Sequence, residues 1–383
     1  MNRLFHKYAH YALALSMFLV VLSPASGMGG DGRQGQGMLL AKLAPDTPIA
    51  TVEPAVFDKT HPAVRAAMAV QNRHTRDLLA IPEVVGTAIG LTDAGRPAVL
   101  VFTRAETTFG AIPASLDGVP TVVRVTGEIV ALKPAGKGSS TTAVLTPPVP
   151  IGVSTGNANE CAAGTIGARV ISGTTVYALS NNHVYAQENA AALGSQEVQP
   201  GLYDTQCLLR SNNLLGTLAA FVPIQFNNST CDPAANPSAC NVVDAAIALS
   251  STAALGNSTP GNGYGIPNSS TYVSVNPNGP YVGQPVQKYG RTTSLTSGTI
   301  TGLNATVTVS YGTGKSAVFM DQIVIGSNKP FSKAGDSGSL IVTNDTHAYP
   351  VGLLFAGGTG TTIANPIEDV LGSFSVTIDG TSR

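Results

Sequence analysis

Short apolar runs broken by glycine, asparagine and proline fill the chain from residue 151 to residue 383. Val176–Ser180, Val242–Leu249 and Val351–Phe355 are typical of these runs. Helix-type spacing of apolar residues does not occur in this part of the chain before Ile367–Leu371. Short β-type runs between turn residues are typical of an all-β sandwich or barrel. The pattern therefore predicts a β-rich domain over residues 151–383.

A different pattern precedes this domain. Pro62 favours the start of a helix, because its fixed φ and missing N–H suit the first helical turn. Strand-like runs follow at Val84–Leu91, Ala98–Thr103, Val119–Val125 and Glu128–Leu132. One helix followed by several strands predicts a small α+β module over residues 53–133.

The segments on either side of this module lack such patterning. Residues 134–150 are rich in Pro, Gly, Ser and Thr and form a predicted linker, and residues 28–52 form a Gly-rich, flexible lead-in. Residues 1–27 combine a basic start, an apolar run and small residues, which is typical of a secretory signal peptide. The apolar run Tyr11–Leu22 has 12 residues. A membrane-spanning helix needs about 20, so we expect no transmembrane anchor.

Composition and charge narrow the choice of partners. The chain has 21 Lys and Arg residues, 22 Asp and Glu residues and a net charge of −1. This balance gives no reason to expect nucleic acid or an anionic membrane as a partner. The 42 glycines, the 25 prolines and the lack of tryptophan fit short strands and turns better than long helices. The oligomeric state stays open.

Four cysteines lie beyond the signal segment, at Cys161, Cys207, Cys231 and Cys240. An even number in an exported chain suggests disulfides, although several pairings exist. The pair Cys231–Cys240 is favoured because it closes a short loop, and Cys161–Cys207 then remains. A zinc site is the alternative, but no Cys-x-x-Cys pair or histidine cluster supports it.

The pentapeptide Gly335-Asp336-Ser337-Gly338-Ser339 is the most informative chemical feature of the chain. A serine between glycines suits a tight turn that exposes its hydroxyl beside unpaired backbone N–H groups, as a nucleophile needs. An ordinary surface turn is the alternative, because Gly, Asp and Ser dominate turns. A histidine and an aspartate earlier in the chain decide between the two.

The favoured general base is His183, because it follows a strand-like run at a point where the chain turns. The other histidines beyond the signal segment are His61, His74 and His347, which fall beside a predicted helix or in a polar turn. Asp244 is the favoured acid because it interrupts a very apolar run, where a lone carboxylate needs a partner. Asp204 and Asp232 are rivals, but their loop-like surroundings require no partner.

The order His183, Asp244, Ser337 argues against an α/β-hydrolase, whose histidine comes last and whose motif has glycine where Ser339 stands. Ser-Asn-Asn-His-Val, Val-Asp-Ala-Ala-Ile-Ala-Leu and Gly-Asp-Ser-Gly-Ser resemble, in this order, the three motifs of chymotrypsin-like serine proteases. Gly290-Arg291-Thr292-Thr293 followed by Gly298-Thr299-Ile300-Thr301 resembles a segment of the bacterial branch of α-lytic protease and the streptogrisins. The resemblance covers roughly residues 151–375.

The resemblance implies two six-stranded antiparallel β-barrels with the active site in the cleft between them. It implies Ser337 as the nucleophile, His183 as the general base and acid, and Asp244 as the residue that orients the imidazole. The backbone N–H groups of Gly335 and Ser337 would form the oxyanion hole.

The resemblance also implies a cation beside Asp336. The bacterial branch places an arginine in its Gly-Arg-Thr-Thr segment, so we expect a pair between Arg291 and Asp336. The chain departs from the family pattern at Asn181 and Asn182, where small residues usually precede the histidine, and at Val184, where a cysteine usually follows it.

Phe331 stands where trypsin-type enzymes carry an acid, and Leu354–Gly357 resembles the strand that pairs with bound peptide. The predicted substrate pocket comprises Phe331, Ala334, Phe355, Ala356 and Gly357. None of these residues is acidic, so an apolar or small residue is expected before the scissile bond. The implied activity is that of a secreted or periplasmic serine endopeptidase that cleaves polypeptides through an acyl-enzyme and needs no metal or other cofactor.

Three questions stay open at this point. Residues 53–133 have about the size and class of the pro-region that assists folding and inhibits α-lytic-type proteases, but an accessory module fits equally well. A catalytically weak or inactive protease-fold protein would instead bind peptides or proteins. In a β-rich adhesion domain, the histidine, aspartate and serine would lie apart in space.

Overall fold

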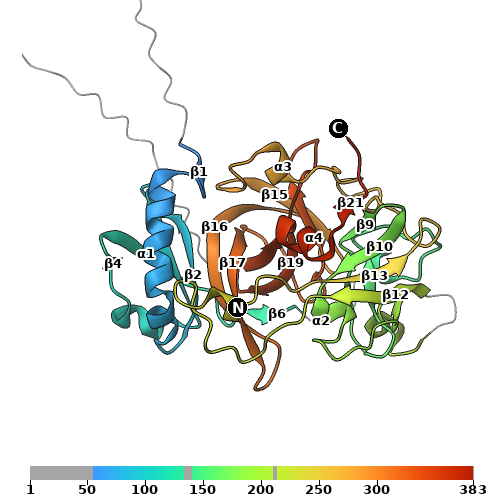
Figure 1. Cartoon of the computed structure of the whole chain (residues 1–383), viewed down its shortest axis with the longest axis horizontal. Coiled ribbons are helices and arrows are strands. Elements are labelled where there is room, and N and C mark those ends of the chain that lie inside the picture. The colour runs from blue at the N-terminus through green and yellow to red at the C-terminus, as the bar shows by residue number, and fades with distance from the viewer. Residues whose placement is uncertain (1–54, 133–139, 210–213, 383) are drawn as a thin grey trace, which may run out of the picture. The chain divides into compact units, whose positions relative to one another are not determined.

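The computed structural model describes residues 55–132, 140–209 and 214–382. The predicted signal segment and lead-in lie outside the described residues, as does the beginning of the predicted linker. The described chain is mainly β, as predicted, and most of its strands form two large sheets of eight and eleven strands (Figure 1). A small third sheet pairs β1 (Phe57–Asp58) with β14 (Tyr281–Val282).

The eight-stranded sheet curls into the first barrel. Its strands lie in the order β21 (Thr377–Ile378), β9 (Ala168–Ser172), β10 (Thr175–Ser180), β13 (Ala246–Ser250), β12 (Leu214–Phe221), β11 (Gln196–Val198), β7 (Ser154–Asn157) and β8 (Gly164–Thr165). β8 pairs with β7 at one end of this order and leads along the chain into β9 near the other end, through Ile166 and Gly167. This connection closes the sheet around a core that includes Ile151, Ile166 and Leu218.

Six strands of the larger sheet form the second barrel. They lie in the order β15 (Pro285–Gly290), β18 (Leu340–Thr343), β19 (Pro350–Gly358), β20 (Thr361–Pro366), β17 (Ser316–Gly326) and β16 (Ser294–Ser310). β15 also pairs with β16, so the ring closes. The predicted two-barrel architecture is confirmed, and the first barrel adds the two-residue strands β8 and β21 to the expected six.

Short helices connect these strands: α2 (Asn182–Tyr185), α3 (Tyr272–Val275), η2 (Ser140–Thr142), η3 (Leu202–Thr205) and η4 (Pro237–Ala239). The predicted helix at Ile367–Leu371 is α4 (Ile367–Phe374). The predicted strand Val242–Leu249 is shorter than expected, because β13 begins only at Ala246. The residues before Ala246 hold the Asp244 side chain in a buried, hydrogen-bonded position instead of joining the ladder.

The segment before the barrels has the predicted α+β composition. It comprises α1 (Pro62–Leu79), β2 (Val84–Leu91), β3 (Pro97–Thr103), η1 (Glu106–Ala111), β4 (Ser115–Leu116), β5 (Val119–Val125) and β6 (Val130–Ala131). His61 caps the helix, because its Nδ1 accepts the Ala63 N–H at 3.2 Å. Val64 and Leu78 of α1 share a buried cluster with Val99 of β3. No helix of the described residues is long and apolar enough to cross a membrane.

The sheet of this segment continues the second barrel. β2 pairs antiparallel with β16, from Leu303 opposite Ile89 to Val307 opposite Gly86. β16 is 17 residues long, so it reaches beyond its contacts in the ring and forms a ladder with the earlier segment as well. The division of the chain into a module at 53–133 and a protease domain stays a prediction.

Two disulfides join Cys161 to Cys207 and Cys231 to Cys240. This is the pairing that the sequence favours. The first bond holds the chain just after η3, and the second closes the loop that leads to Asp244.

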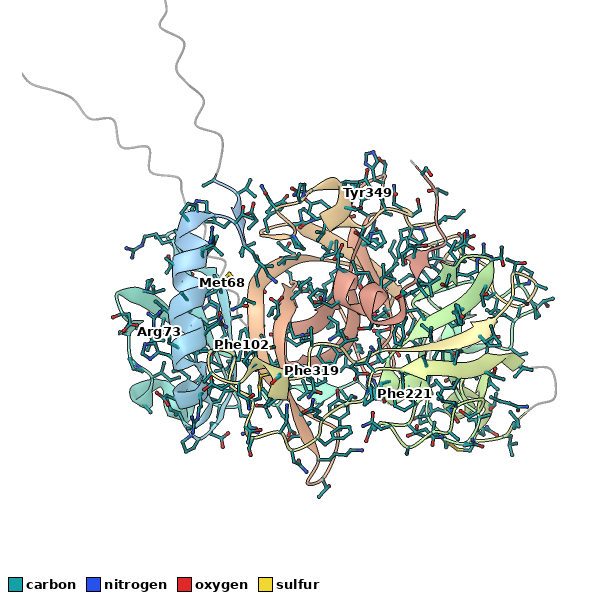
Figure 2. All side chains as sticks on the ribbon, in the orientation of Figure 1. Met68, Arg73, Phe102, Phe221, Phe319 and Tyr349 are labelled. Atoms are coloured by element: carbon teal, nitrogen blue, oxygen red, sulfur yellow. A yellow bond between two sulfur atoms is a disulfide. The ribbon has the colours of Figure 1, made fainter. Side chains whose placement is uncertain are left out.

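The hydrophobic core also runs across the continuous sheet. Phe102 of β3 belongs to the same buried cluster as Phe319 of β17 and Phe355 of β19 (Figure 2 labels Phe102 and Phe319). The ring centroids of Phe319 and Phe355 lie 4.8 Å apart. A change at Phe102 therefore alters the packing of the barrel that carries these two rings.

We predict that Phe102→Ala destabilises the earlier segment and the second barrel together. Such a change in a packed core costs about 3–5 kcal/mol, so thermal unfolding followed by circular dichroism should remain a single transition at a lower Tm. Val125→Ala on the same sheet is the control, because Val125 is 42% exposed. Two transitions, of which only one moves in Phe102→Ala, would contradict a shared core.

Candidate active site

His183 lies on the short helix α2, directly after β10. Two asparagine side chains fix this turn: Asn181 Nδ2 donates to the Asp244 carbonyl at 2.6 Å, and Asn182 Nδ2 donates to the Val222 carbonyl at 2.7 Å. Both asparagines are fully buried. The residues that depart from the family pattern therefore anchor the histidine turn to neighbouring segments.

His183 and Asp244 form a buried pair. Nδ1 of the imidazole lies 2.7 Å from Asp244 Oδ2, and the His183 backbone N–H donates to Oδ1 at 3.2 Å. The side chains are only 1% and 0% exposed. Because an ionised carboxylate can only accept hydrogen bonds, Nδ1 carries the ring proton and Nε2 is left as the basic nitrogen. Nε2 is buried and has no hydrogen-bond partner among the described residues.

Tyr311 completes this group, and the sequence gives no signal for it. Its hydroxyl donates to Asp244 Oδ2 at 2.8 Å, and its ring meets the His183 ring edge-on at a centroid distance of 6.0 Å. Burial, with the Asp244 charge as a smaller cause, raises the pKa of Tyr311 well above its ordinary value. The phenol therefore remains a hydrogen-bond donor to Asp244.

The Ser337 turn depends on two glycines in the left-handed region. Gly335 has φ 96° and Gly338 has φ 92°. A Cβ at Gly338 would lie 2.3 Å from the Thr165 carbonyl oxygen, and one at Gly335 would lie 2.5 Å from Arg291 Nη1. Only glycine fits either position, because a side chain would be strained and would also clash.

Thr165 of β8 joins this turn to the first barrel. Its N–H donates to the Ser337 carbonyl at 2.8 Å and its hydroxyl to the Gly335 carbonyl at 2.9 Å. Its carbonyl accepts the Ser180 hydroxyl at 2.8 Å, at the end of the strand that leads to the histidine. Thr165 is fully buried. One residue thus fixes the serine turn relative to the histidine strand.

The structure brings His183 and Asp244 into contact and places the Ser337 turn beside the histidine helix. A Cβ at Gly164 would lie 2.5 Å from Val184 and 3.0 Å from the Ser337 carbonyl oxygen, so both segments pack against this glycine. Ser337 Oγ donates to the Phe355 carbonyl at 3.2 Å. Among the described residues, no hydrogen bond joins Ser337 Oγ to His183 Nε2.

The predicted pair between Arg291 and Asp336 does not form. Arg291 Nε donates to Asp204 Oδ2 at 2.8 Å, a second bond links Nη2 to Oδ1, and both side chains are buried. The expectation that Asp204 needs no partner is therefore wrong as well. Arg291 faces the first barrel, where η3 holds Asp204 and Ser154 Oγ donates to the same carboxylate at 2.6 Å.

Asp336 is held instead by the residues around its own turn. Oδ1 accepts the N–H groups of Thr292 and Thr293 at 2.8 and 3.1 Å. Oδ2 accepts the Thr293 hydroxyl at 2.7 Å and the Lys333 N–H at 2.9 Å. Lys288 Nζ lies 3.7 Å from Oδ2.

The chain's own residues pair with the strand that is predicted to bind a peptide. β6 pairs antiparallel with β19, with Ala131 opposite Ala356 and Val130 opposite Gly357. The next residue, Leu132, donates its N–H to the Phe355 carbonyl at 3.4 Å. Its carbonyl accepts the Gly335 N–H at 2.7 Å, which is the group predicted to serve as an oxyanion-hole donor.

Leu132 also fills the predicted pocket. Its side chain is buried in one cluster with Phe331, and a Cβ at Gly357 would lie 3.5 Å from its Cδ1. Phe355 contributes its carbonyl rather than its ring, which packs in a different cluster. The Ala334 carbonyl accepts the Thr292 hydroxyl at 2.8 Å.

The remaining polar candidates have structural partners. His74 Nε2 lies 3.1 Å from Asp117, and His347 is exposed beside Asp345. Asp232 accepts the N–H groups of two following residues in a turn. Within the described ranges, no three His, Cys, Asp or Glu side chains gather in a way that could hold a metal ion.

Comparison with known proteins finds similarity over parts of the chain. Streptogrisin-A of Streptomyces griseus is 33% identical over 143 residues, which are 32% of this chain and 45% of that protein. The chain resembles the bacterial branch of the chymotrypsin-like serine proteases. The matched residues span less than half the length of streptogrisin-A. A family profile described as the Nal1 C-terminal domain matches residues 266–365.

Solved structures with similar folds include three proteases. A glutamic acid specific serine protease is 20% identical with a TM-score of 0.40, over 60% of this chain and 100% of that chain. Thermobifida fusca protease A is 18% identical with a TM-score of 0.40, over 61% and 100%. An α-lytic protease homolog called N4 is 17% identical with a TM-score of 0.39, over 60% and 99%.

Thr165 gives a stability prediction for the joint between the barrels. Thr165→Val removes the hydroxyl that donates to Gly335 and accepts the Arg291 N–H at 3.0 Å. Leaving buried polar groups without partners costs about 1–3 kcal/mol each, so the urea midpoint should fall with an unchanged m-value. Thr175→Val, at an exposed position of β10, is the control. Equal midpoints for the two variants would contradict the role of Thr165.

Proposed function

We propose that the chain is a serine endopeptidase that uses Ser337, His183 and Asp244. The supporting observation is the buried His183–Asp244 pair, which leaves Nε2 basic and unbonded beside the Ser337 turn. The relatives of the chain are serine proteases. An adhesion domain is not favoured, because the histidine and the aspartate are in direct contact.

In the proposed reaction, Ser337 Oγ turns away from Phe355 and attacks the carbonyl carbon of the scissile bond. Its proton passes to His183 Nε2, and the charge on the imidazole is balanced by Asp244. The Gly335 N–H would donate to the oxyanion. Collapse of the tetrahedral intermediate transfers the proton to the leaving amine and forms an ester with Ser337. Water then attacks this ester by the same route and releases the carboxylate.

Labelling with a fluorophosphonate probe tests this proposal. We expect the probe to modify Ser337, and Ser337→Ala to abolish both labelling and peptide hydrolysis, with kcat lower on the order of 10⁴- to 10⁶-fold. Ser297→Ala, at an exposed position of β16, should label like the unchanged protein. If neither the unchanged protein nor Leu132→Asp, which is described below, labels or hydrolyses peptide while folded, the alternative of a protease-fold module that binds peptides is favoured.

We also propose that the earlier segment acts as an inhibitory pro-region. A peptide substrate of this fold would lie antiparallel to β19, and Val130–Leu132 already lies there. The Leu132 carbonyl accepts the Gly335 N–H, and the Leu132 side chain packs with Phe331 in the predicted pocket. An external substrate must therefore displace this segment before it can reach Ser337.

The same contacts support a preference for an apolar residue before the scissile bond. Leu132 lies in a buried apolar cluster with Val286, Ile300 and Phe331. We propose that a substrate places a residue of similar size there. Cleavage confined to bonds after Lys, Arg or Glu would contradict this preference.

The displacement model predicts that Leu132→Asp raises activity. A charged side chain is costly to bury in an apolar pocket, so the segment should leave the groove and fluorophosphonate labelling should become at least about tenfold faster. Hydrolysis of the peptide acetyl-Val-Ala-Leu-p-nitroanilide should rise in parallel. Leu193→Asp makes the same change at a 64% exposed position and serves as the control. Equal labelling rates in both variants would contradict inhibition by this segment.

We place the protein outside the cytoplasm, in the periplasm or the medium. The signal-like residues 1–27 and the two disulfides support this location, because such bonds persist in oxidising compartments. Detection of a mature chain without these residues in the medium or periplasm would test it.

A further inference from the structure

A buried lysine lies behind the Ser337 turn. Lys288 is on β15, and its side chain is 0% exposed. Its ammonium donates to the Thr293 hydroxyl, and to the Ser294 carbonyl at 3.0 Å. It lies 3.7 Å from Asp336 Oδ2, and 5.9 Å from the centroid of the Phe331 ring.

Asp336 needs this charge because its other partners are neutral. Three backbone N–H groups and one hydroxyl donate to the carboxylate, which is fully buried. A positive charge nearby adds a favourable electrostatic interaction to these four neutral hydrogen bonds. Arg291 is turned toward Asp204 and does not bond Asp336.

The surroundings of Lys288 contain no competing charge. Asp336 is the only charged group that acts on it within the described residues. Thr293, just before β16, and Ser294 of β16 accept from the ammonium. The ladder partners of Lys288 are Thr296 in β16 and Ile341 in β18. The Lys333 side chain, next to the turn, is exposed to solvent.

We propose that Lys288 is a positioning residue for the nucleophile: its ammonium holds Asp336, which holds the Ser337 turn, and activity falls when the ammonium loses its proton. The Thr293 hydroxyl connects the two charges, because it accepts from Lys288 and donates to Asp336 Oδ2. Asp336 in turn accepts the N–H of Lys333, two residues before Gly335. This inference rests on the proposed function.

Burial determines the pH at which the Lys288 ammonium loses its proton. It lowers the pKa of Lys288 from 10.5 to about 8, against the opposing effect of Asp336. Above this pH the folded protein loses the proton while the unfolded chain keeps it, so the free energy of unfolding rises with pH between about 8 and the unfolded value. Activity should therefore fall over a range in which this group makes the fold more stable.

The experiment compares Lys288→Met with the unchanged protein on acetyl-Val-Ala-Leu-p-nitroanilide. At pH 7 we expect kcat/KM of Lys288→Met to be at least about tenfold lower. The unchanged protein should lose about tenfold by pH 9 as the lysine deprotonates, so the two should converge. Lys288→Arg keeps a charge that does not titrate here and should lack this decline, whereas Lys329→Met, at an exposed position, should retain it. A constant ratio between Lys288→Met and the unchanged protein at pH 7 and 9 would overturn the proposal.

A second measurement does not depend on catalysis. In a Ser337→Ala background, the urea midpoint of the Lys288 protein should rise from pH 8 to 9.5 relative to that of the Lys288→Met protein. Equal pH dependences would overturn the proposal even if the enzyme is active. Absence of labelling and hydrolysis at every pH would instead contradict the proposed function, and the stability comparison would still test the buried pair.

Discussion

The arrangement of the site depends on the hydrogen bonds that Thr165 makes between the two barrels. The Ser337 turn comes from the second barrel and the histidine helix from the first, so neither barrel alone sets the distance between them. Thr165 binds two carbonyls of the Ser337 turn and, through its own carbonyl, the last residue of the histidine strand. Glycines at 335 and 338 allow the close approach that these bonds require. The geometry of the candidate site therefore depends on the interface between the two barrels.

Two buried ion pairs lie beside the Ser337 turn and have different structural roles. Arg291 and Asp204 connect the second barrel to η3 of the first, close to the disulfide of Cys207. Lys288 and Asp336 lie within the second barrel and hold the shape of the turn itself. The single arginine–aspartate pair that the sequence motif suggests would have to connect the two barrels and also hold the shape of the turn. The division leaves the turn dependent on a lysine whose pKa burial lowers to about 8, and an arginine would stay charged there.

The sequence is a good guide to the class of fold and to the contact between His183 and Asp244, and a poor guide to the other partners of the site residues. Glycine spacing and the apolar surroundings of Asp244 are local signals, and the structure agrees with both. Tyr311 lies 67 positions from Asp244 in an ordinary hairpin, so nothing local marks it. Arg291 illustrates the same limit: its segment predicts a pair with Asp336, but the structure pairs it with Asp204, because the first barrel places η3 beside it.

The ladder between β2 and β16 explains how a short segment can occupy the groove so effectively. A free tripeptide would lose its translational freedom on binding, and few contacts would offset that loss. Val130–Leu132 is already tethered, because β2 pairs with β16 and shares a core with Phe319 and Phe355. Its local concentration at the groove is then set by the chain and not by diffusion. Loss of Leu132 from the pocket alone would leave this ladder intact, so the proposed inhibition could be removed without undocking the segment.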